Sequence, residues 1–381
     1  MCEEQYQKCL AWGVENGLKL DSRIERKKIN GVYGMYATED IPGDTVIASY
    51  PVEQLMFQKE KRPENVSDDV SAVYLASIEL SKGQKSQYFY LLEMFESLEE
   101  LKEYSFYYFT EAECLWIQKL NPILLRLVIE RRYYIDELKE KIKKIDSTLS
   151  DDYVVQAALN YCSRSWGGGV AFVPVLDLFN HSYRKGGNIS RIDNDSRVAH
   201  KTNVAFSKGE QIFISYSCAD LASYAINYNY YDSEDFHFID LAYRSLYLVK
   251  TELKKKVFEF VEKNYGGFFS NTNIGLHFRI TTQKLFLFEN APSLKVIRYF
   301  EHITLLESKL KQEKNSDEAS LSAILLVIDS FLMANNVDQI DLKDVPNKLQ
   351  RFYFLAKKER EMLLANRSWA LDCSGVANLV T

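Results

Sequence analysis

The sequence predicts an α+β protein in which two β-rich segments share one domain. Short alternating apolar runs, interrupted by glycine and proline, occur in residues 1–66 and again in 163–236. Residues 67–162 and 237–381 instead have apolar residues at helical spacing. The two β-rich segments must meet in space to share a core, which makes 67–162 a helical insert and 237–381 a separate helical domain.

Residues 1–66 are expected to form short strands after a first helix. Pro42-Gly43-Asp44 is a strong turn signal, because proline presets its φ and glycine and aspartate favour turn geometries. Gly31 and Gly34 can adopt a positive φ or let a ligand approach the backbone. Glycines near a strand are more often parts of turns, so these two alone predict little.

The helical insert, 67–162, contains two clear helix starts. Asn121-Pro122 precedes a long segment of helical periodicity, and proline fits the first helical position because the missing N–H would be unsatisfied there anyway. Ser150, followed by Asp151 and Asp152, is typical of an N-cap with acidic residues in the first turn.

The stretch VPVLDLFNHS, Val173–Ser182, begins as an apolar run and ends in polar residues. We interpret the run as a core strand, with Asp177 holding a turn beside Asn180 and His181. Further along, 197–206 and 211–216 are expected to pair as a β-hairpin with Gly209 in its turn.

The tail, 237–381, is expected to be all helical. Its most apolar segment, Leu321–Ala334, is shorter than the roughly 20 residues that span a bilayer and contains Asp329. We therefore interpret it as a core helix and expect no membrane association. The other segments with helical periodicity are 253–263, 293–310 and 350–371.

Composition argues against several classes of protein. The net charge of −6 argues against a general nucleic-acid-binding surface. The six cysteines form no CxxC pair and the five histidines show no HxH or HxxxH spacing, so we expect neither a metal site nor a disulfide framework. The N-terminus lacks a continuous apolar region typical of a secretory signal. We expect a cytoplasmic monomer, with the nucleus as a second compatible location.

Four short motifs contain the residues suited to chemistry. They are GVYGMYAT at 31–38, SRSW at 163–166, DLFNHS at 177–182 and GEQIFISYS at 209–217, the last followed by YAINYNYYD at 224–232. Each has an ordinary structural explanation when taken singly: Arg164 can cap a helix or form a surface ion pair, and an Asn-His pair is more often structural. Tyr216 can be a half-buried tyrosine with a bonded hydroxyl.

Taken together and in this order, the motifs resemble those of the SET-domain protein methyltransferases. They are most similar to the branch that includes the Rubisco large-subunit lysine methyltransferase and the actin-histidine methyltransferase. The resemblance implies a β-rich SET domain with a pseudoknot, split by the helical insert and followed by an all-helical substrate-binding domain. It also implies S-adenosyl-L-methionine as the cofactor. The residues that it assigns to the cofactor are Tyr33, Gly34, Met35, Arg164, Asn180, His181, Tyr216 and Tyr228.

The resemblance also implies a role for each of these residues. Backbone at 33–35 would contact the cofactor, and Arg164 would lie near its methionine carboxylate. Asn180 and His181 would hold the adenine ring and the amino group. Tyr216 would be the catalytic tyrosine, and Tyr228 would form a wall of the cofactor site or of the target channel.

The implied reaction is methyl transfer to a lysine of a protein substrate, which is the expected partner. A protein histidine is an alternative acceptor, and a binding module without catalysis is an alternative of another class. Three departures from the family pattern motivate the binding module: Val32 and Asn229 replace glycines, and Tyr230 replaces a phenylalanine. Trp166, in place of another phenylalanine, is a mild change. Retention of Arg164, Asn180, His181 and Tyr216 argues for catalysis.

Overall fold

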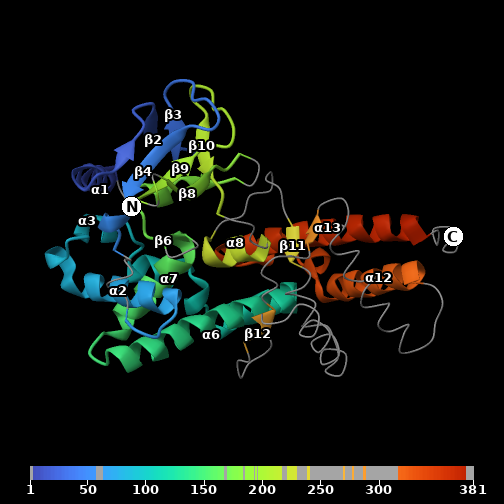
Figure 1. The fold of residues 1–381 in the computed structure, drawn as a ribbon. Helices are drawn as coiled ribbons and strands as arrows, with labels where there is room; N and C mark the ends of the chain where they lie inside the picture. Colours follow the sequence, from blue (N-terminus) through green and yellow to red (C-terminus); the bar gives the residue numbers. More distant parts are fainter. Residues whose placement is uncertain are drawn as a thin grey trace. The chain divides into compact units, whose positions relative to one another are not determined.

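The structure is a computed structural model whose chain divides into two compact units (Figure 1). The first unit comprises Met1–Phe109, Val128–Ala219 and Ile226–Asn229, and the second comprises Thr110–Leu127, Asp220–Ala225 and Tyr230–Thr381. The described residues are 3–56, 63–166, 170–182, 185–192, 194, 196–216, 221–229, 238–240, 269–270, 277–278, 286–288 and 316–374.

Two four-stranded sheets lie in the described part of the first unit. One has the order β1-β4-β9-β8, formed by Lys19–Leu20, Val46–Pro51, Arg197–Lys201 and Asn188–Ile192. The other has the order β2-β3-β10-β7, formed by Ile24–Ile29, Val32–Ala37, Gln211–Ile214 and Asn180–His181. Each sheet mixes strands from both β-rich segments, and one apolar core includes buried residues from both sheets. The prediction that the two segments share a domain is therefore confirmed.

A two-residue turn joins β2 to β3. Ile29 pairs with Val32 across the ladder, and the intervening Asn30 and Gly31 have φ angles of 51° and 86°. Two successive positive φ angles are typical of the type I′ hairpin turn, which favours Asn-Gly. Gly31 therefore serves the turn.

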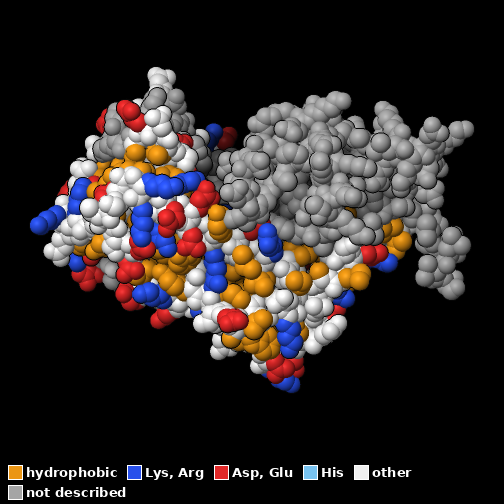
Figure 2. Space-filling view, turned by 90° about the horizontal axis from the view of Figure 1, so that it is seen from below, with side chains coloured by type: hydrophobic (Ala, Val, Ile, Leu, Met, Phe, Trp, Pro, Cys, Tyr) orange, Lys and Arg blue, Asp and Glu red, His pale blue; other side chains and the backbone are white. Residues whose placement is uncertain are grey.

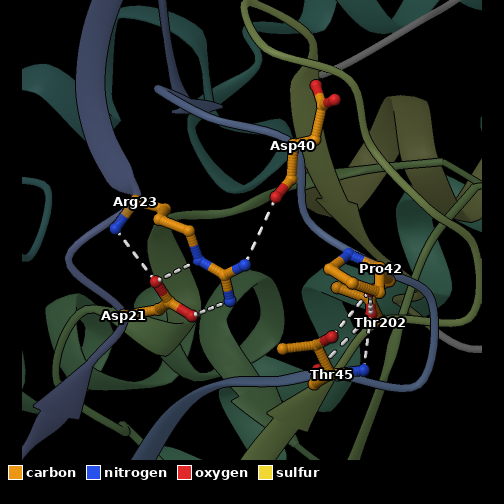
Figure 3. Close-up of polar contacts among 6 residues, drawn as sticks. All are labelled: Asp21, Arg23, Asp40, Pro42, Thr45 and Thr202. Atoms are coloured by element: carbon orange, nitrogen blue, oxygen red, sulfur yellow. Dashed lines mark hydrogen bonds and ion pairs between the residues drawn. The ribbon is translucent and has the colours of Figure 1, made fainter.

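The turn predicted at 42–44 is present and is held by a neighbouring segment (Figure 3). Asp44 has a φ of 63°. The hydroxyl of Thr45 donates to the carbonyl of Pro42 at 2.7 Å, and the hydroxyl of Thr202 donates to the same carbonyl at 3.2 Å. The backbone N–H of Thr45 donates to the Thr202 hydroxyl at 3.0 Å, so the start of β4 is fixed against the end of β9.

The hairpin predicted between 197–206 and 211–216 is wrong. β9 pairs with β4 and β8, whereas β10 pairs with β3 and β7 in the other sheet. The chain changes sheets because Phe206 forms a bridge with Ile41 after β9 ends. Gly209 does lie in a turn, with a φ of 86°. Its N–H donates to the carbonyl of Ala37, which guides the chain into β10 beside β3.

The apolar run within VPVLDLFNHS is buried, but it is not a strand. Phe172 and Val175 have positive φ angles of 61° and 68°, and Leu176–Leu178 forms a 3₁₀ helix, η5. Pro174 lacks the N–H that a central strand would donate, which disfavours a ladder here. Strand structure begins only at β7, after a two-stranded pair of β5 (Ser165–Trp166) with β6 (Val170–Ala171).

The first helix is present and 67–162 is helical, although Thr110–Leu127 belongs to the second unit. Pro122 is the first residue of α6, and the hydroxyl of Ser150 accepts the backbone N–H of Asp152 at the start of α7. The α-helices are α1 (Glu3–Glu15), α2 (Asp68–Lys82), α3 (Phe89–Leu92), α4 (Leu98–Tyr104), α5 (Glu111–Leu120), α6 (Pro122–Ile145) and α7 (Asp151–Arg164). Short 3₁₀ helices are η1 (Val52–Gln54), η3 (Gly83–Lys85) and η4 (Phe106–Tyr108).

Among its described residues the C-terminal region is mainly helical, and short strands correct the expectation of an all-helical tail. Helix α12 (Ser316–Ala334) contains the predicted core helix and buries Ile324, Ile328 and Phe331. It is followed by η6 (Val337–Gln339), η7 (Leu342–Asp344), η8 (Asn347–Leu349) and α13 (Gln350–Ser374). The strand pairs are β11 (Phe238–Asp240) with β14 (Phe286–Phe288), and β12 (Phe269–Ser270) with β13 (His277–Phe278). The helices predicted over 253–263 and 293–310 lie outside the described residues.

Two surface properties bear on function. Within the described ranges, no helix combines the length and apolarity that crossing a membrane requires. On the face drawn in Figure 2, lysine and arginine side chains are interspersed with aspartate and glutamate among the described residues.

Candidate active site

Strands β3, β7 and β10 bring three of the four motifs side by side. β7 runs parallel to β10, with Asn180 opposite Phe213 and His181 opposite Ile214. β3 pairs with the other edge of β10, in antiparallel register, with Met35 opposite Ile212. Parallel neighbours require a crossover, and here the chain between them supplies β8 and β9 of the other sheet.

The chain crosses itself closely at the end of β10. The N–H of Ser182 donates to the carbonyl of Ile214 at 3.1 Å, and the N–H of Ser215 donates to the carbonyl of Gly187 at 2.9 Å. A Cβ on Gly186 would lie 2.2 Å from the carbonyl oxygen of Ser182, so this crossing has room only for glycine. The chain that follows β7 thus contacts the last residues of β10 first on one edge, at Ser182, and then on the other edge, at Gly187. This crossing is the one that the expected pseudoknot requires.

Asn180 fixes the segment predicted to contact the cofactor through its backbone. Its side-chain Nδ2 donates to the carbonyl of Tyr33 at 2.9 Å. Gly34 faces the Gln211 side chain, because a Cβ there would lie 2.4 Å from Gln211 Nε2. Met35 is fully buried and lies opposite Arg26 on β2 and Ile212 on β10, so neither its side chain nor its backbone is exposed in this structure.

His181 holds Tyr216 through two contacts. The backbone N–H of Tyr216 donates to His181 Nδ1 at 3.0 Å, and the two rings stack with centroids 5.1 Å apart. Because Nδ1 accepts this bond, the neutral imidazole carries its proton on Nε2. His181 is buried, so this geometry is enclosed by protein.

Tyr216 lies between two aromatic rings, with its hydroxyl turned to the backbone. The hydroxyl donates to the carbonyl of Phe179 at 3.0 Å, and the Tyr228 ring stacks on Tyr216 with centroids 4.6 Å apart. Tyr228 follows helix α8 (Leu221–Asn227). Burial raises the pKa of Tyr216 well above its usual range and raises the pKa of Tyr228 to about 12. Both side chains are therefore neutral phenols at physiological pH.

Arg164 and Asp177 form a buried ion pair. Arg164 is the last residue of α7, and its Nη1 donates to Asp177 Oδ2 at 2.9 Å. The Arg164 and Asp177 side chains are only 11% and 2% exposed, respectively. Burial raises the pKa of Asp177, and the facing guanidinium opposes that rise. Within the described residues, Asp177 Oδ1 has no hydrogen-bond partner.

Asp177 is therefore a site residue that the sequence analysis missed. The expected role of holding a local turn is replaced by a charge pair with a second motif. The available signal was an acid and a base in two neighbouring motifs, with the acid flanked by Leu176 and Leu178. Asn229 is exposed, with a φ of 51°, and Tyr230 lies outside the described residues.

Comparison with known families gives the class of the protein. The SET domain family model matches residues 32–217, so the chain contains a SET domain. No curated protein sequence gives a significant match.

Solved structures show the architecture beyond the SET domain. A structure of the SET domain of LSMT bound to methyllysine and AdoHcy matches with a TM-score of 0.65 and 15% identity, covering 99% of this chain and 93% of that chain. Rubisco LSMT bound to sinefungin and monomethyllysine matches with a TM-score of 0.66 and 14% identity, covering 100% and 94% of the respective chains. The structure of Rubisco LSMT bound to AdoMet matches with a TM-score of 0.64 and 14% identity, covering 98% of this chain and 92% of that chain. The chain thus contains a SET domain and shares the fold of these LSMT structures over nearly its whole length, which confirms the predicted fold class.

Proposed function

We propose that this protein is a methyltransferase that uses S-adenosyl-L-methionine to methylate a lysine side chain of a protein substrate. The observation that carries the proposal is the position of Tyr216. Its backbone is held by His181, its ring is stacked between His181 and Tyr228, and its hydroxyl is oriented by the carbonyl of Phe179. A phenol that is fixed at its backbone, its ring and its hydroxyl is suited to orient a small reacting group.

The residues present fit the cofactor's amino acid end. That end has a carboxylate and an ammonium group, which need a cation and an acceptor. Arg164 uses Nη1 for Asp177 and has further N–H groups that can bind the carboxylate. The unpartnered Oδ1 of Asp177 is a buried acceptor for the ammonium, and satisfying it would remove a desolvation cost of about 1–3 kcal/mol.

Asn180, His181 and the backbone at 33–35 would hold the remainder of the cofactor. Asn180 already joins two of these segments through the Tyr33 carbonyl. When bound, the cofactor supplies an electrophilic methyl group on a sulfonium. The chain's own contribution is to align the acceptor with that methyl and to exclude water, which can supply on the order of 7–11 kcal/mol of the barrier reduction.

Tyr216 would orient the acceptor amine. Because its hydroxyl proton is given to Phe179, the phenol oxygen retains lone pairs that can accept an N–H from the amine. A neutral phenol also avoids stabilising the ammonium form, which cannot attack. The raised pKa of Tyr216 therefore favours the reactive neutral amine.

The aromatic rings around Tyr216 also favour the neutral form of the acceptor amine. A lysine ammonium has a reference pKa of about 10.4, and burial beside apolar rings lowers it. The amine lone pair forms the new N–C bond as the S–C bond breaks, and the product amine then releases its extra proton to solvent. The lysine and methyllysine bound to LSMT support lysine as the acceptor here.

The test uses labelled methyl groups. Purified protein is incubated with methyl-labelled S-adenosylmethionine and a protein extract, with Tyr216→Phe in parallel. We expect a labelled protein band that depends on Tyr216, and methyllysine after acid hydrolysis of that band. Methylhistidine would reassign the acceptor, and cofactor binding without transfer to any extract would favour the binding module. No cofactor binding by calorimetry would refute the proposal.

A further inference from the structure

We propose that Arg26 is a positioning residue that sets the affinity for S-adenosylmethionine by fixing Tyr33. This inference rests on the proposed function, because Tyr33 belongs to the segment assigned to the cofactor. Arg26 lies on β2, outside all four motifs, and the resemblance assigns it no role. Its effect would pass through the Tyr33 ring.

The guanidinium of Arg26 lies over the Tyr33 ring. Its central carbon is 3.7 Å from the ring centroid, although the two residues lie on adjacent strands and are not directly opposite in the register. The Arg26 side chain is only 3% exposed. A cation held over an aromatic face is attracted most strongly when it is desolvated, so this contact belongs to the stronger class.

The first helix holds Arg26 in place. Its Nη1 donates to Glu3 Oε2 at 3.0 Å, and its guanidinium carbon is 4.9 Å from the Tyr6 ring centroid. Tyr6 is buried, and burial raises its pKa to about 12, with the Arg26 charge opposing the rise. Arg26 therefore has a charged partner and a buried ring on α1, in addition to the Tyr33 ring on β3.

Tyr33 is consequently fixed at its ring and at its carbonyl, in addition to the pairing of its strand with β2. Arg26 holds its ring, and Asn180 Nδ2 holds its carbonyl at 2.9 Å. The pairing of β3 with β2, which places Tyr33 opposite Lys28, and the carbonyl bond fix the backbone, whereas the Arg26 contact fixes the orientation of the ring. Without Arg26, the ring must be ordered when the cofactor binds, and that cost weakens binding.

The chain offers a matched control in Lys28. Its Nζ also lies over the Tyr33 ring, at 5.1 Å from the centroid, but Lys28 is exposed. A hydrated ammonium at that distance contributes little. Lys28→Gln removes a cation that lies on the same strand and near the same ring. It therefore separates the contact of the Arg26 guanidinium with the Tyr33 ring, called the clamp below, from a general effect of charge.

The experiment measures cofactor affinity by calorimetry and turnover at saturating cofactor for wild type, Arg26→Gln, Arg26→Lys and Lys28→Gln. We expect Arg26→Gln to weaken affinity on the order of tenfold, because a desolvated cation–π contact is lost, with kcat changed less than about twofold. Arg26→Lys should recover part of the affinity, and Lys28→Gln should match wild type. Wild-type affinity in Arg26→Gln, or an equal loss in Lys28→Gln, would overturn the inference.

Two further measurements apply if Arg26→Gln folds poorly or if the wild type does not bind the cofactor. If Arg26→Gln folds poorly, Tyr33→Leu removes the ring while leaving Arg26 with Glu3, and it should weaken affinity to a similar extent; unchanged affinity overturns the clamp. If wild type binds no cofactor, the proposed function falls. Amide exchange at Tyr33 and Gly34 then decides the clamp alone: faster exchange in Arg26→Gln supports it, and equal exchange overturns it.

Discussion

His181 Nδ1 accepts the backbone N–H of Tyr216 at 3.0 Å, and the two rings stack with centroids 5.1 Å apart. One buried side chain thus sets both the position of the Tyr216 backbone and the plane of its ring. The parallel pairing of β7 with β10 makes this geometry available, because it places His181 opposite Ile214, two residues before Tyr216. The imidazole is therefore a positioning group for the proposed catalytic tyrosine.

Substitution of His181 should separate the acceptor atom from the ring. In His181→Asn, the amide oxygen can accept the Tyr216 N–H, whereas His181→Leu leaves it without an acceptor. We expect turnover to fall by roughly 100-fold in His181→Leu, since misplacement of a reacting group by about 1 Å costs this much. The loss in His181→Asn should be smaller. Single-turnover rates at saturating cofactor measure the effect, and equal rates for both variants would contradict it.

The pH dependence of turnover should identify the acceptor. A lysine must lose its proton, so the rate should rise with pH above 7, whereas a histidine of pKa about 6.5 would give a plateau from about pH 7. Tyr216 must keep its proton to donate to Phe179, and burial raises its pKa. No descending limb from Tyr216 is therefore expected below about pH 10. A rate that falls between pH 8 and 10, with the protein still folded, would contradict the role given to the neutral phenol.

The sequence predicted features that depend on local chemistry. Pro122 begins its helix, Ser150 caps another, and 42–44 forms a turn, because each depends on the few residues around it. The partners of β9 and β10 were not predictable in this way. Alternation indicates which face of a strand is buried, but the pairing is set by contacts such as Ile41 with Phe206, which are remote in sequence.

In the site, too, some residues were predictable from local motifs, whereas the role of one depends on contacts between distant segments. Asn180, His181 and Tyr216 were predicted from motif resemblance, and the structure brings them together. Asp177 was assigned to a turn, because its ion pair with Arg164 depends on how α7 ends against the buried segment around η5. One signal was overlooked: Asn30-Gly31 is a strong hairpin sequence, and it accounts for Gly31 without a ligand.

Removal of the Asp177 charge should affect both stability and cofactor binding. Asp177→Asn leaves the Arg164 guanidinium buried without its counter-ion, and breaking a buried pair in this way costs about 3–5 kcal/mol. Cofactor affinity should fall as well, since Oδ1 no longer carries charge for the ammonium. Urea unfolding and calorimetry measure the two effects.

A double variant distinguishes these two effects. Arg164→Met with Asp177→Leu replaces the pair by apolar side chains, which restores much of the stability lost in Asp177→Asn, because no charge remains buried. Cofactor affinity should not recover. A double variant that binds the cofactor as wild type does would show that the pair has only a structural role.

His200 should make the stability of the first unit depend on pH. It lies on β9, is fully buried, and meets the Phe179 ring edge-on at a centroid distance of 4.6 Å. Burial lowers its pKa from 6.5 to about 3. Between these two values the unfolded chain binds a proton at this position and the folded protein does not, so acid favours unfolding. The neutral histidine's contribution is fully present above pH 6.5 and is lost progressively as the pH falls towards 3.

Comparison with His200→Leu isolates this effect from the carboxylates that titrate in the same range. Leucine is apolar and of similar volume, and it cannot bind a proton. Each pH unit within the window removes about 1.4 kcal/mol from the wild type, so lowering the pH from 7 to 5 should cost it roughly 2 kcal/mol more than it costs the variant. Urea unfolding of both proteins at the two pH values gives this difference directly. Parallel loss of stability in the two proteins would mean that His200 keeps an ordinary pKa in the folded state.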